Sequence, residues 1–154
     1  MKLILFGAGA SYGSSKGKVP PLGAALFSEL RRFDKDGWGA LPSEIASKFE
    51  EDFELGMERL SQTRPHSMPI LQRAMAKYFV QFTLREDSLY LQLAKLIKRS
   101  KWRGSITTLN YDLLLESSLV WEGIRIVQLR DPGLGEVELC WPHGCCNIFC
   151  NGVE

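Results

Sequence analysis

Apolar positions along the chain follow two different periods, and the shorter runs predict strands. Residues 2–6 are apolar after the lysine and stop at a glycine-rich turn, as a short buried strand does. Residues 104–108 are rich in β-branched side chains, which favour strands. Three more strands are expected at 124–129, 137–141 and 147–150.

Between the first two predicted strands the apolar positions follow a helical period. A first helix is expected at about 22–32, where leucines recur at helical spacing and the end is basic. A second apolar stripe has spacings of three and four and predicts one continuous helix with Ser43 as its N-cap. Its members are Ile45, Phe49, Phe53, Met57 and Leu60.

Three further helices complete the expected elements. They lie at about 67–84, 89–99 and 112–120, and residues 12–21 are expected to be loop because of their glycines and prolines. The simplest use of all these apolar stripes is core packing. The order strand, helices, strand, helix, strand is typical of a parallel α/β sheet. We therefore expect a single domain over 1–154, with a Rossmann-like sheet and a helical layer or subdomain inserted at about 42–100.

Composition and charge give no indication of a nucleic-acid-binding or membrane-spanning protein. Hydrophobic residues make up 45% of the chain and charged residues 24%, which is ordinary for a globular domain. The net charge of +1 gives no basic excess, so direct nucleic-acid binding is not expected. The apolar run at 3–6 is too short for a signal core or a membrane span. We expect a cytoplasmic protein without a membrane partner.

The first segment with candidate chemistry directly follows the first predicted strand. Residues 7–11 read Gly-Ala-Gly-Ala-Ser, and glycines at a strand end let backbone N–H groups approach a phosphate closely. The segment departs from the full dinucleotide fingerprint because Tyr12 stands where a third glycine would be. It also lacks the Gly-Lys-Ser/Thr of a P-loop. A glycine-rich turn without a ligand remains the alternative.

The second segment, Thr-Thr-Leu-Asn-Tyr-Asp at 107–112, lies at the expected carboxyl end of a strand. Open α/β sheets build their binding sites at this edge. Asn110 offers both a donor and an acceptor, which suits ribose hydroxyls or a carboxamide. Asp112 could accept a hydrogen bond from a ligand, or it could cap the helix that follows, and the sequence leaves both roles open.

The third segment reads Trp-Pro-His-Gly at 141–144. An imidazole in a turn after a strand can face a cleft, and it titrates near neutrality, so His143 is a candidate general base. A lone histidine is more often a surface or turn residue, which is the alternative. The only other histidine, His66, stands in an expected loop.

Taken in order, these three segments resemble the sirtuin family. Sirtuins carry a Gly-Ala-Gly-x-Ser loop, a Thr-x-Asn-x-Asp segment and a later His-Gly pair. The chain has the first at 7–11, the second at 108–112 and the third at 143–144, followed by Cys-Cys-Asn, similar to the His-Gly-Ser-x-Asn run of bacterial sirtuin-like proteins.

The resemblance implies a Rossmann-like domain that binds NAD across its strand ends. Asn110 and His143 would be the catalytic residues, with His143 as the base toward ribose hydroxyls. No metal ligand is implied. The cofactor-binding residues would be Gly7, Ala8, Gly9, Ser11, Thr108, Asn110 and Asp112.

Departures from the deacetylating sirtuins favour a different branch of the family. Their first loop continues with Pro-Asp-Phe-Arg, whereas residues 18–23 read Lys-Val-Pro-Pro-Leu-Gly. This points toward the divergent bacterial antiphage-defence type, in which such domains hydrolyse NAD. A complete domain of this type would need roughly a hundred further residues, so the chain resembles its N-terminal part. The expected partners are an effector or sensor domain beyond the chain and further copies of the chain in a homo-oligomer.

The four cysteines offer a rival interpretation as a zinc site. They are Cys140, Cys145, Cys146 and Cys150, and no C-x-x-C pair occurs among them. The adjacent pair would point to opposite faces of an extended strand. Free thiols are the more common outcome for such spacing, but a site that includes His143 stays open.

Several functions follow from these observations. The leading one is an NAD glycohydrolase that releases nicotinamide and ADP-ribose in antiphage defence. The alternatives are a non-catalytic module that senses NAD or ADP-ribose, and a protein deacylase or ADP-ribosyl transferase. A helical interaction domain with an incidental glycine loop would be excluded by a parallel sheet with residues 3–6 at its centre.

Overall fold

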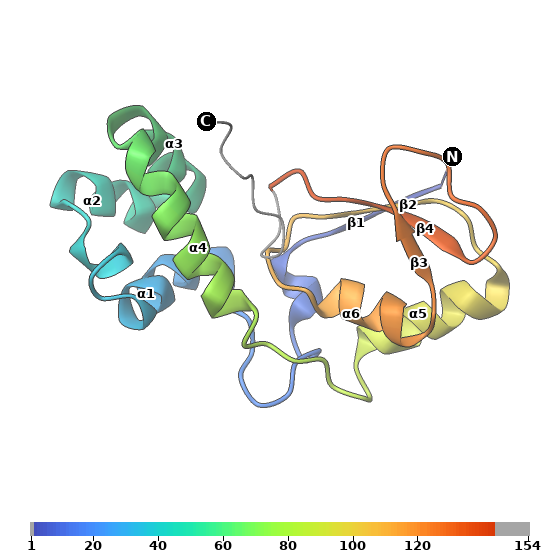
Figure 1. The fold of residues 1–154 in the computed structure, drawn as a ribbon. Helices are drawn as coiled ribbons and strands as arrows, with labels where there is room; N and C mark the ends of the chain where they lie inside the picture. Colours follow the sequence, from blue (N-terminus) through green and yellow to red (C-terminus); the bar gives the residue numbers. More distant parts are fainter. Residues whose placement is uncertain (1, 144–154) are drawn as a thin grey trace. The chain divides into compact units, whose positions relative to one another are not determined.

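The computed structural model describes residues 2–143, which divide into two compact units. One unit contains residues 2–20 and 79–143, and the other contains residues 21–78. We call them the sheet unit and the helical unit (Figure 1). The elements of the sheet unit are β1 (Leu3–Phe6), the 3-10 helix η1 (Ala8–Ser11), α5 (Leu89–Ser100), β2 (Ser105–Thr108), α6 (Leu114–Trp121), β3 (Arg125–Val127) and β4 (Glu136–Cys140).

The sheet is parallel throughout, with the strand order β1-β2-β4-β3. Its register pairs Ile4 with Ile106 and Ile106 with Leu139. Helices α5 and α6 lie together on one side of the sheet (Figure 1). This arrangement confirms the expected α/β class and is consistent with a Rossmann-like fold. The presence of the sheet excludes a purely helical domain, although β1 is the outermost strand of the described order and not its centre as expected.

The core of the sheet unit lies between the strands and these two helices. Alternate strand positions face opposite sides of a sheet. Ile106 and Leu139 are buried, whereas Leu3 and Leu5 on β1 are 60% and 61% exposed. Helices α5 and α6 contribute further buried side chains to this core, which are Tyr90, Leu91, Ala94, Ile97, Leu114, Leu115 and Leu119.

The helical unit packs around one buried tryptophan. Trp38 has no exposed surface, and its indole N–H donates a 2.9 Å hydrogen bond to the carbonyl oxygen of Leu71. Its ring contacts the rings of Phe27, Phe49 and Phe53. The elements are α1 (Gly23–Phe33), η2 (Trp38–Ala40), α2 (Ser43–Glu51), α3 (Phe53–Thr63), η3 (Pro65–Ser67) and α4 (Met68–Phe79), the last residue of which belongs to the sheet unit.

The prediction of one continuous helix over residues 45–60 is wrong, because the helix is interrupted at Asp52. The backbone of Asp52 is extended, with φ −158°. Its carboxylate accepts hydrogen bonds from the N–H groups of Glu54 and Leu55, and so caps α3. The stripe keeps its spacing across the break because both helices bury it in the same core. Ser43 is likewise the first residue of α2, not its N-cap.

The other expected boundaries differ from the structure mainly at the helix predicted over 67–84. That helix ends at Phe79, and Leu84 forms an isolated antiparallel bridge with Ser15. The strand expected at 147–150 lies outside the described residues. No helix in the described part of the chain has both the length and the apolar character needed to cross a membrane.

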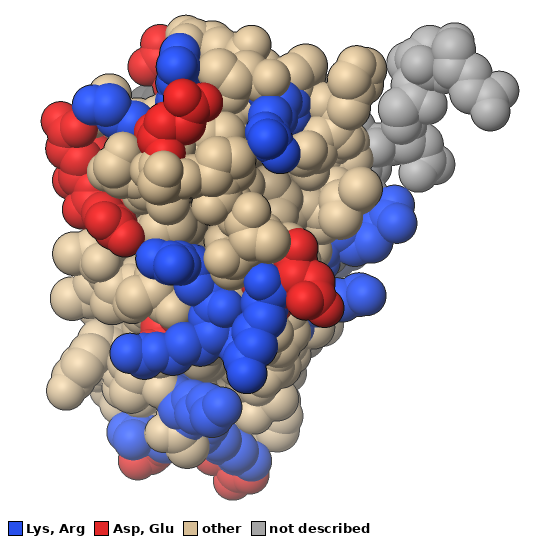
Figure 2. Space-filling view, turned by 90° about the vertical axis from the view of Figure 1, so that its left-hand side faces the viewer, with Lys and Arg blue, Asp and Glu red and all other residues tan. Residues whose placement is uncertain are grey.

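Charged side chains of both signs share the face of the molecule drawn in Figure 2. Lys and Arg side chains gather over its centre and lower part, with Asp and Glu beside them. In the helical unit several charged side chains form ion pairs, including Lys48 with Glu51 and Arg32 with Glu29. Such exposed pairs stabilise a fold by little, about 0–1 kcal/mol each.

Candidate functional site

Three sequence segments meet at one edge of the sheet. The strand order places β2 between β1 and β4, and in a parallel sheet all carboxyl ends lie at the same edge. Residues 7–11 follow β1, residues 109–112 follow β2, and residues 141–143 follow β4. The topology therefore brings together the segments that carry the candidate chemistry.

The glycine loop leaves its backbone open. Gly7, Ala8 and Gly9 are exposed, and a Cβ added at either glycine would meet nothing within 4 Å. The first hydrogen bond of η1 runs from the N–H of Ala10 to the carbonyl of Gly7, at 2.9 Å. The N–H groups of Ala8 and Gly9 precede that bond, as the first donors of any helix do. The loop can thus present backbone donors to an anionic group without side chains in the way.

The first two segments are joined by side-chain hydrogen bonds. The hydroxyl of Ser11 donates to the Asp112 carboxylate at 2.7 Å, and the Asn110 amide donates to the Ser11 oxygen at 2.9 Å. All three side chains are buried. We call Ser11, Asn110, Asp112 and Tyr90 the polar cluster, since Tyr90 completes it.

Tyr90 is a member of the cluster that sequence reasoning missed. Its hydroxyl lies 3.2 Å from the Asn110 amide nitrogen and 3.3 Å from the Ser11 oxygen. Its ring packs edge-on against Phe6. Burial raises the pKa of Tyr90 to about 12, so the phenol keeps its proton at neutral pH. In the sequence Tyr90 is one aromatic residue in an amphipathic helix, which gives no signal of a polar contact.

Asp112 supports the start of α6 without being its N-cap, which is Leu113, and its role toward a ligand stays a prediction. One carboxylate oxygen accepts the N–H of Leu114 at 3.0 Å, near the start of α6, and the other accepts the Ser11 hydroxyl. Burial raises the pKa of Asp112, and these two hydrogen bonds oppose the rise. The side chain therefore fixes the helix and the glycine loop together.

Asn110 has one acceptor left over. Its backbone N–H donates to the Thr108 hydroxyl at 3.1 Å, and its side-chain nitrogen donates to Ser11 and Tyr90. Its side-chain oxygen is buried and has no hydrogen-bond partner within the described residues. A buried polar atom without a partner costs about 1–3 kcal/mol, so it favours a donor that arrives from outside the cluster.

The third segment contacts the second through aromatic rings. His143 is exposed, and its ring centroid lies 6.4 Å from that of Tyr111, which stands between Asn110 and Asp112. Just before it, the indole N–H of Trp141 donates to the carboxylate of Glu116 on α6. Glu116 was not expected at the site, although a lone acid in a leucine-rich helix is a usable sequence signal.

Metal ligands do not gather among residues 2–143. No group of three or more histidine, cysteine or acidic side chains there could hold a metal ion. Cys140 is a free thiol whose pKa is raised by burial and by Glu138. The remaining candidates for a zinc site, Cys145, Cys146 and Cys150, lie outside the described residues.

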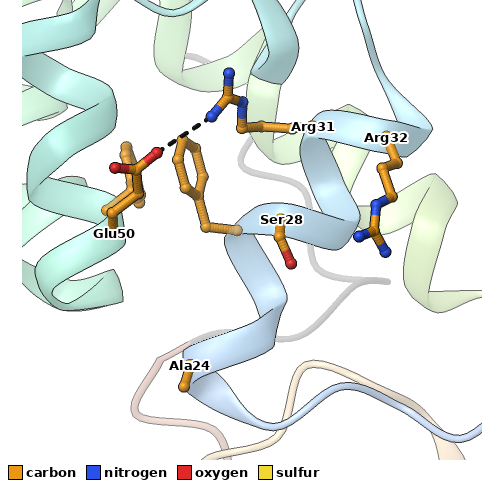
Figure 3. A pocket seen from close by; sticks show the side chains of 7 residues that line it. Ala24, Ser28, Arg31, Arg32 and Glu50 are labelled. Carbon is orange, nitrogen blue, oxygen red and sulfur yellow. Dashed lines mark hydrogen bonds and ion pairs between the residues drawn. The ribbon is translucent and has the colours of Figure 1, made fainter.

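The helical unit has a pocket of its own between α1 and α2 (Figure 3). The guanidinium of Arg31 forms an ion pair with the carboxylate of Glu50, with an N–O distance of 3.2 Å, and lies over the ring of Phe27. Arg32 on the same helix is paired with Glu29. These cations are already neutralised by neighbouring carboxylates, which disfavours an anion site. The pocket is lined by Ala24, Phe27, Ser28, Arg31, Arg32, Phe49 and Glu50.

Comparisons with known proteins leave the family unassigned. No model of a known protein family matches the chain, and no curated protein matches it either. The case for a function consequently rests on the geometry at the sheet edge and on the three sequence segments.

Proposed function

We propose that the sheet unit binds NAD at the carboxyl edge of its sheet and cleaves its nicotinamide–ribose bond. The protein would act as an NAD glycohydrolase of the sirtuin-like, antiphage-defence type in the cytoplasm. The observation that carries the proposal is the convergence of residues 7–11, 108–112 and 141–143 at one edge of a parallel sheet.

The open glycine loop supports the binding half of the proposal. Exposed backbone at 7–9 offers N–H donors of the kind that bind a pyrophosphate. Ser11 and Asp112 hold this loop against the segment that follows β2. In this proposal the phosphates lie at the loop, and Thr108, Asn110 and Asp112 line the side of the nicotinamide ribose.

The chemical step needs few protein groups. Water attacks the ribose carbon, the carbon–nitrogen bond breaks, neutral nicotinamide leaves, and one proton is released. The sugar gains positive charge in the transition state, so fixed polar groups around the ribose lower the barrier. We assign the general base toward the ribose hydroxyls to His143, whose imidazole is exposed at the sheet edge. Asn110 would orient the ribose through its unmatched oxygen.

The test is nicotinamide release from NAD, followed by chromatography, for the chain and any longer version that its gene encodes. We expect release that falls by about a hundredfold or more in His143→Ala, as when a general base is lost. His66→Ala is the matched control, because His66 lies in the helical unit. Equal rates for both histidine variants would remove His143 from the mechanism.

Absence of release from every version would contradict the glycohydrolase proposal. One structural observation would then favour a second function, a module that binds NAD or ADP-ribose without cleaving it. Ser11, Asn110 and Asp112 are buried and bonded to one another, which suits rigid support of a loop as well as it suits catalysis. Calorimetric titration with NAD, followed by chromatography of the same mixture, distinguishes the two functions, since the module would bind NAD and leave it intact.

A further inference from the structure

Glu116 is an acidic side chain buried in the apolar helix α6. It is 7% exposed. One carboxylate oxygen accepts the indole N–H of Trp141, and the other has no hydrogen-bond partner within residues 2–143. Ionised groups are costly to bury, so a carboxylate kept at such a position calls for a specific role.

Trp141 connects this carboxylate to the candidate base. It directly follows β4, and two residues later the chain reaches His143, whose ring lies beside Tyr111. Among the described contacts, the Glu116 bond is the one that ties residue 141 to a rigid helix. The segment is therefore held at one end by α6 and at the other by the segment after β2.

We propose that Glu116 is a positioning residue that holds Trp141 and thereby fixes the imidazole of His143 at the sheet edge. The inference rests on the proposed function insofar as His143 is the base. It also makes the position of His143 depend on the charge of Glu116, since that charge sets the strength of the Glu116–Trp141 hydrogen bond.

The surroundings of Glu116 make that charge sensitive to pH near neutrality. Among the described residues the Asp112 carboxylate, two residues before α6, acts on Glu116, and the charge of Glu116 in turn raises the pKa of Tyr90 on α5. Burial raises the pKa of Glu116 to about 7, and the Asp112 charge adds to the rise. Above that pH the Glu116 carboxylate is ionised, and it accepts a stronger hydrogen bond from the Trp141 indole N–H than the neutral carboxyl group does.

The bond can be followed directly by NMR on the full chain labelled with nitrogen-15, without nucleotide. Four indole N–H signals are expected, and Trp141→Phe identifies the relevant one. We expect this signal to move downfield as the pH rises, with a midpoint near 7. In Glu116→Gln the signal should stay hydrogen-bonded but stop titrating, because the amide oxygen still accepts and carries no charge.

Glu116→Leu tests whether the bond positions His143. Leucine suits an apolar helix, so this variant should fold. We expect its Trp141 indole and His143 ring signals to shift while the His66 ring signals stay fixed. A wild-type indole signal that ignores pH, or His143 signals unchanged in Glu116→Leu, would overturn the inference.

Turnover separates this inference from the proposed function. In a chain that cleaves NAD, Glu116→Leu should lower kcat by about tenfold or more with little change in KM, and Glu116→Gln should restore most of it. If the wild-type chain cleaves no NAD, the glycohydrolase proposal fails, and the NMR comparison still decides whether Glu116 positions His143.

Discussion

The Ser11 hydroxyl donates a 2.7 Å hydrogen bond to the Asp112 carboxylate, although the two residues are 101 positions apart in the chain. Together with the bond from the Asn110 amide to Ser11, this bond links the loop after β1 directly to the loop after β2. Because Asp112 also accepts the N–H of Leu114, one carboxylate joins the glycine loop to helix α6. The geometry of the candidate site therefore depends on a bond between two residues that no local pattern connects.

Removing that hydroxyl should destabilise the fold. Ser11→Ala leaves the buried carboxylate of Asp112 with one donor fewer and deprives Asn110 of an acceptor. We expect a loss of about 1–3 kcal/mol in the free energy of unfolding, measured with urea. Ser28→Ala is the control, because its hydroxyl is exposed and bonds only within helix α1. Similar losses in both variants would mean that the cluster adds nothing specific.

The pH dependence of stability should carry the signature of Glu116. Its pKa rises from 4.5 to about 7 in the folded protein, so the folded state binds a proton more tightly than the unfolded state does. The contribution of Glu116 to the free energy of unfolding should therefore be fully present below about pH 4.5. It should be lost as the pH rises through 7, a decrease on the order of 3 kcal/mol.

Glu116→Gln should remove this part of the fall and be more stable than the wild type at pH 8. Urea unfolding between pH 4.5 and pH 8 measures the difference. A smaller dependence of the same sign should remain, because the pKa of Asp112 is also raised. The exposed Glu44 provides the control variant Glu44→Gln, which should keep the wild-type slope.

Glu136 should give a dependence of the opposite sign. Its carboxylate accepts hydrogen bonds from Arg130, Arg125 and the N–H of Gly133, which hold its pKa far below the usual range. The stability it contributes is present above the ordinary carboxyl pKa and is lost as the pH falls. Glu136→Gln should lower the melting temperature at pH 7, and the difference from wild type should shrink as the pH falls from 5 to 2. A difference that grows in acid would contradict the ion-pair account.

Two helical glycines should respond to alanine with opposite signs. At Gly56 in α3, an added Cβ would overlap the ring of Phe49, so Gly56→Ala should cost about 1–3 kcal/mol despite the better helix propensity of alanine. At Gly23, the first residue of α1, a Cβ meets nothing within 4 Å. Gly23→Ala should stabilise by up to about 1 kcal/mol. Thermal unfolding of the two variants compares them directly, and equal effects would refute the packing argument.

The sequence predicted the sheet well because its strands carry a local signal. Residues 3–6 are apolar and end at Gly7, residues 104–108 are rich in β-branched side chains, and the two runs form neighbouring strands. The burial expected for residues 3–6 is wrong, because Leu3 and Leu5 are exposed. The break at Asp52 was missed since the apolar spacing of Phe49 and Phe53 continues across it. The extended backbone of Asp52 and its two capping hydrogen bonds show that the stripe belongs to two helices.

The candidate site was predictable in its segments but not in its bonds. Ser11, Asn110 and Asp112 stand in local motifs. Tyr90 stands on the apolar face of an amphipathic helix and Glu116 in an apolar helix, where the pattern indicates core packing. The hydrogen-bond partners of Tyr90 and Glu116 are distant in the sequence. Ser11 and Tyr90 are 79 positions apart, and Glu116 and Trp141 are 25 positions apart. Information at that range is absent from periodicity and composition.

The pairing of β1 with β2 has a consequence for how fast the chain folds. Leu3 pairs with Ser105, so about a hundred residues lie between the partners, and closing a flexible loop of that length costs about 4 kcal/mol of chain entropy. The helical unit, by contrast, is built from neighbouring helices and can nucleate early. We expect residues 21–78 to acquire protection from hydrogen exchange first. Their collapse would shorten the effective loop and so lower the entropy cost of docking β1, which we expect to remain the slow step because of its long-range pairing.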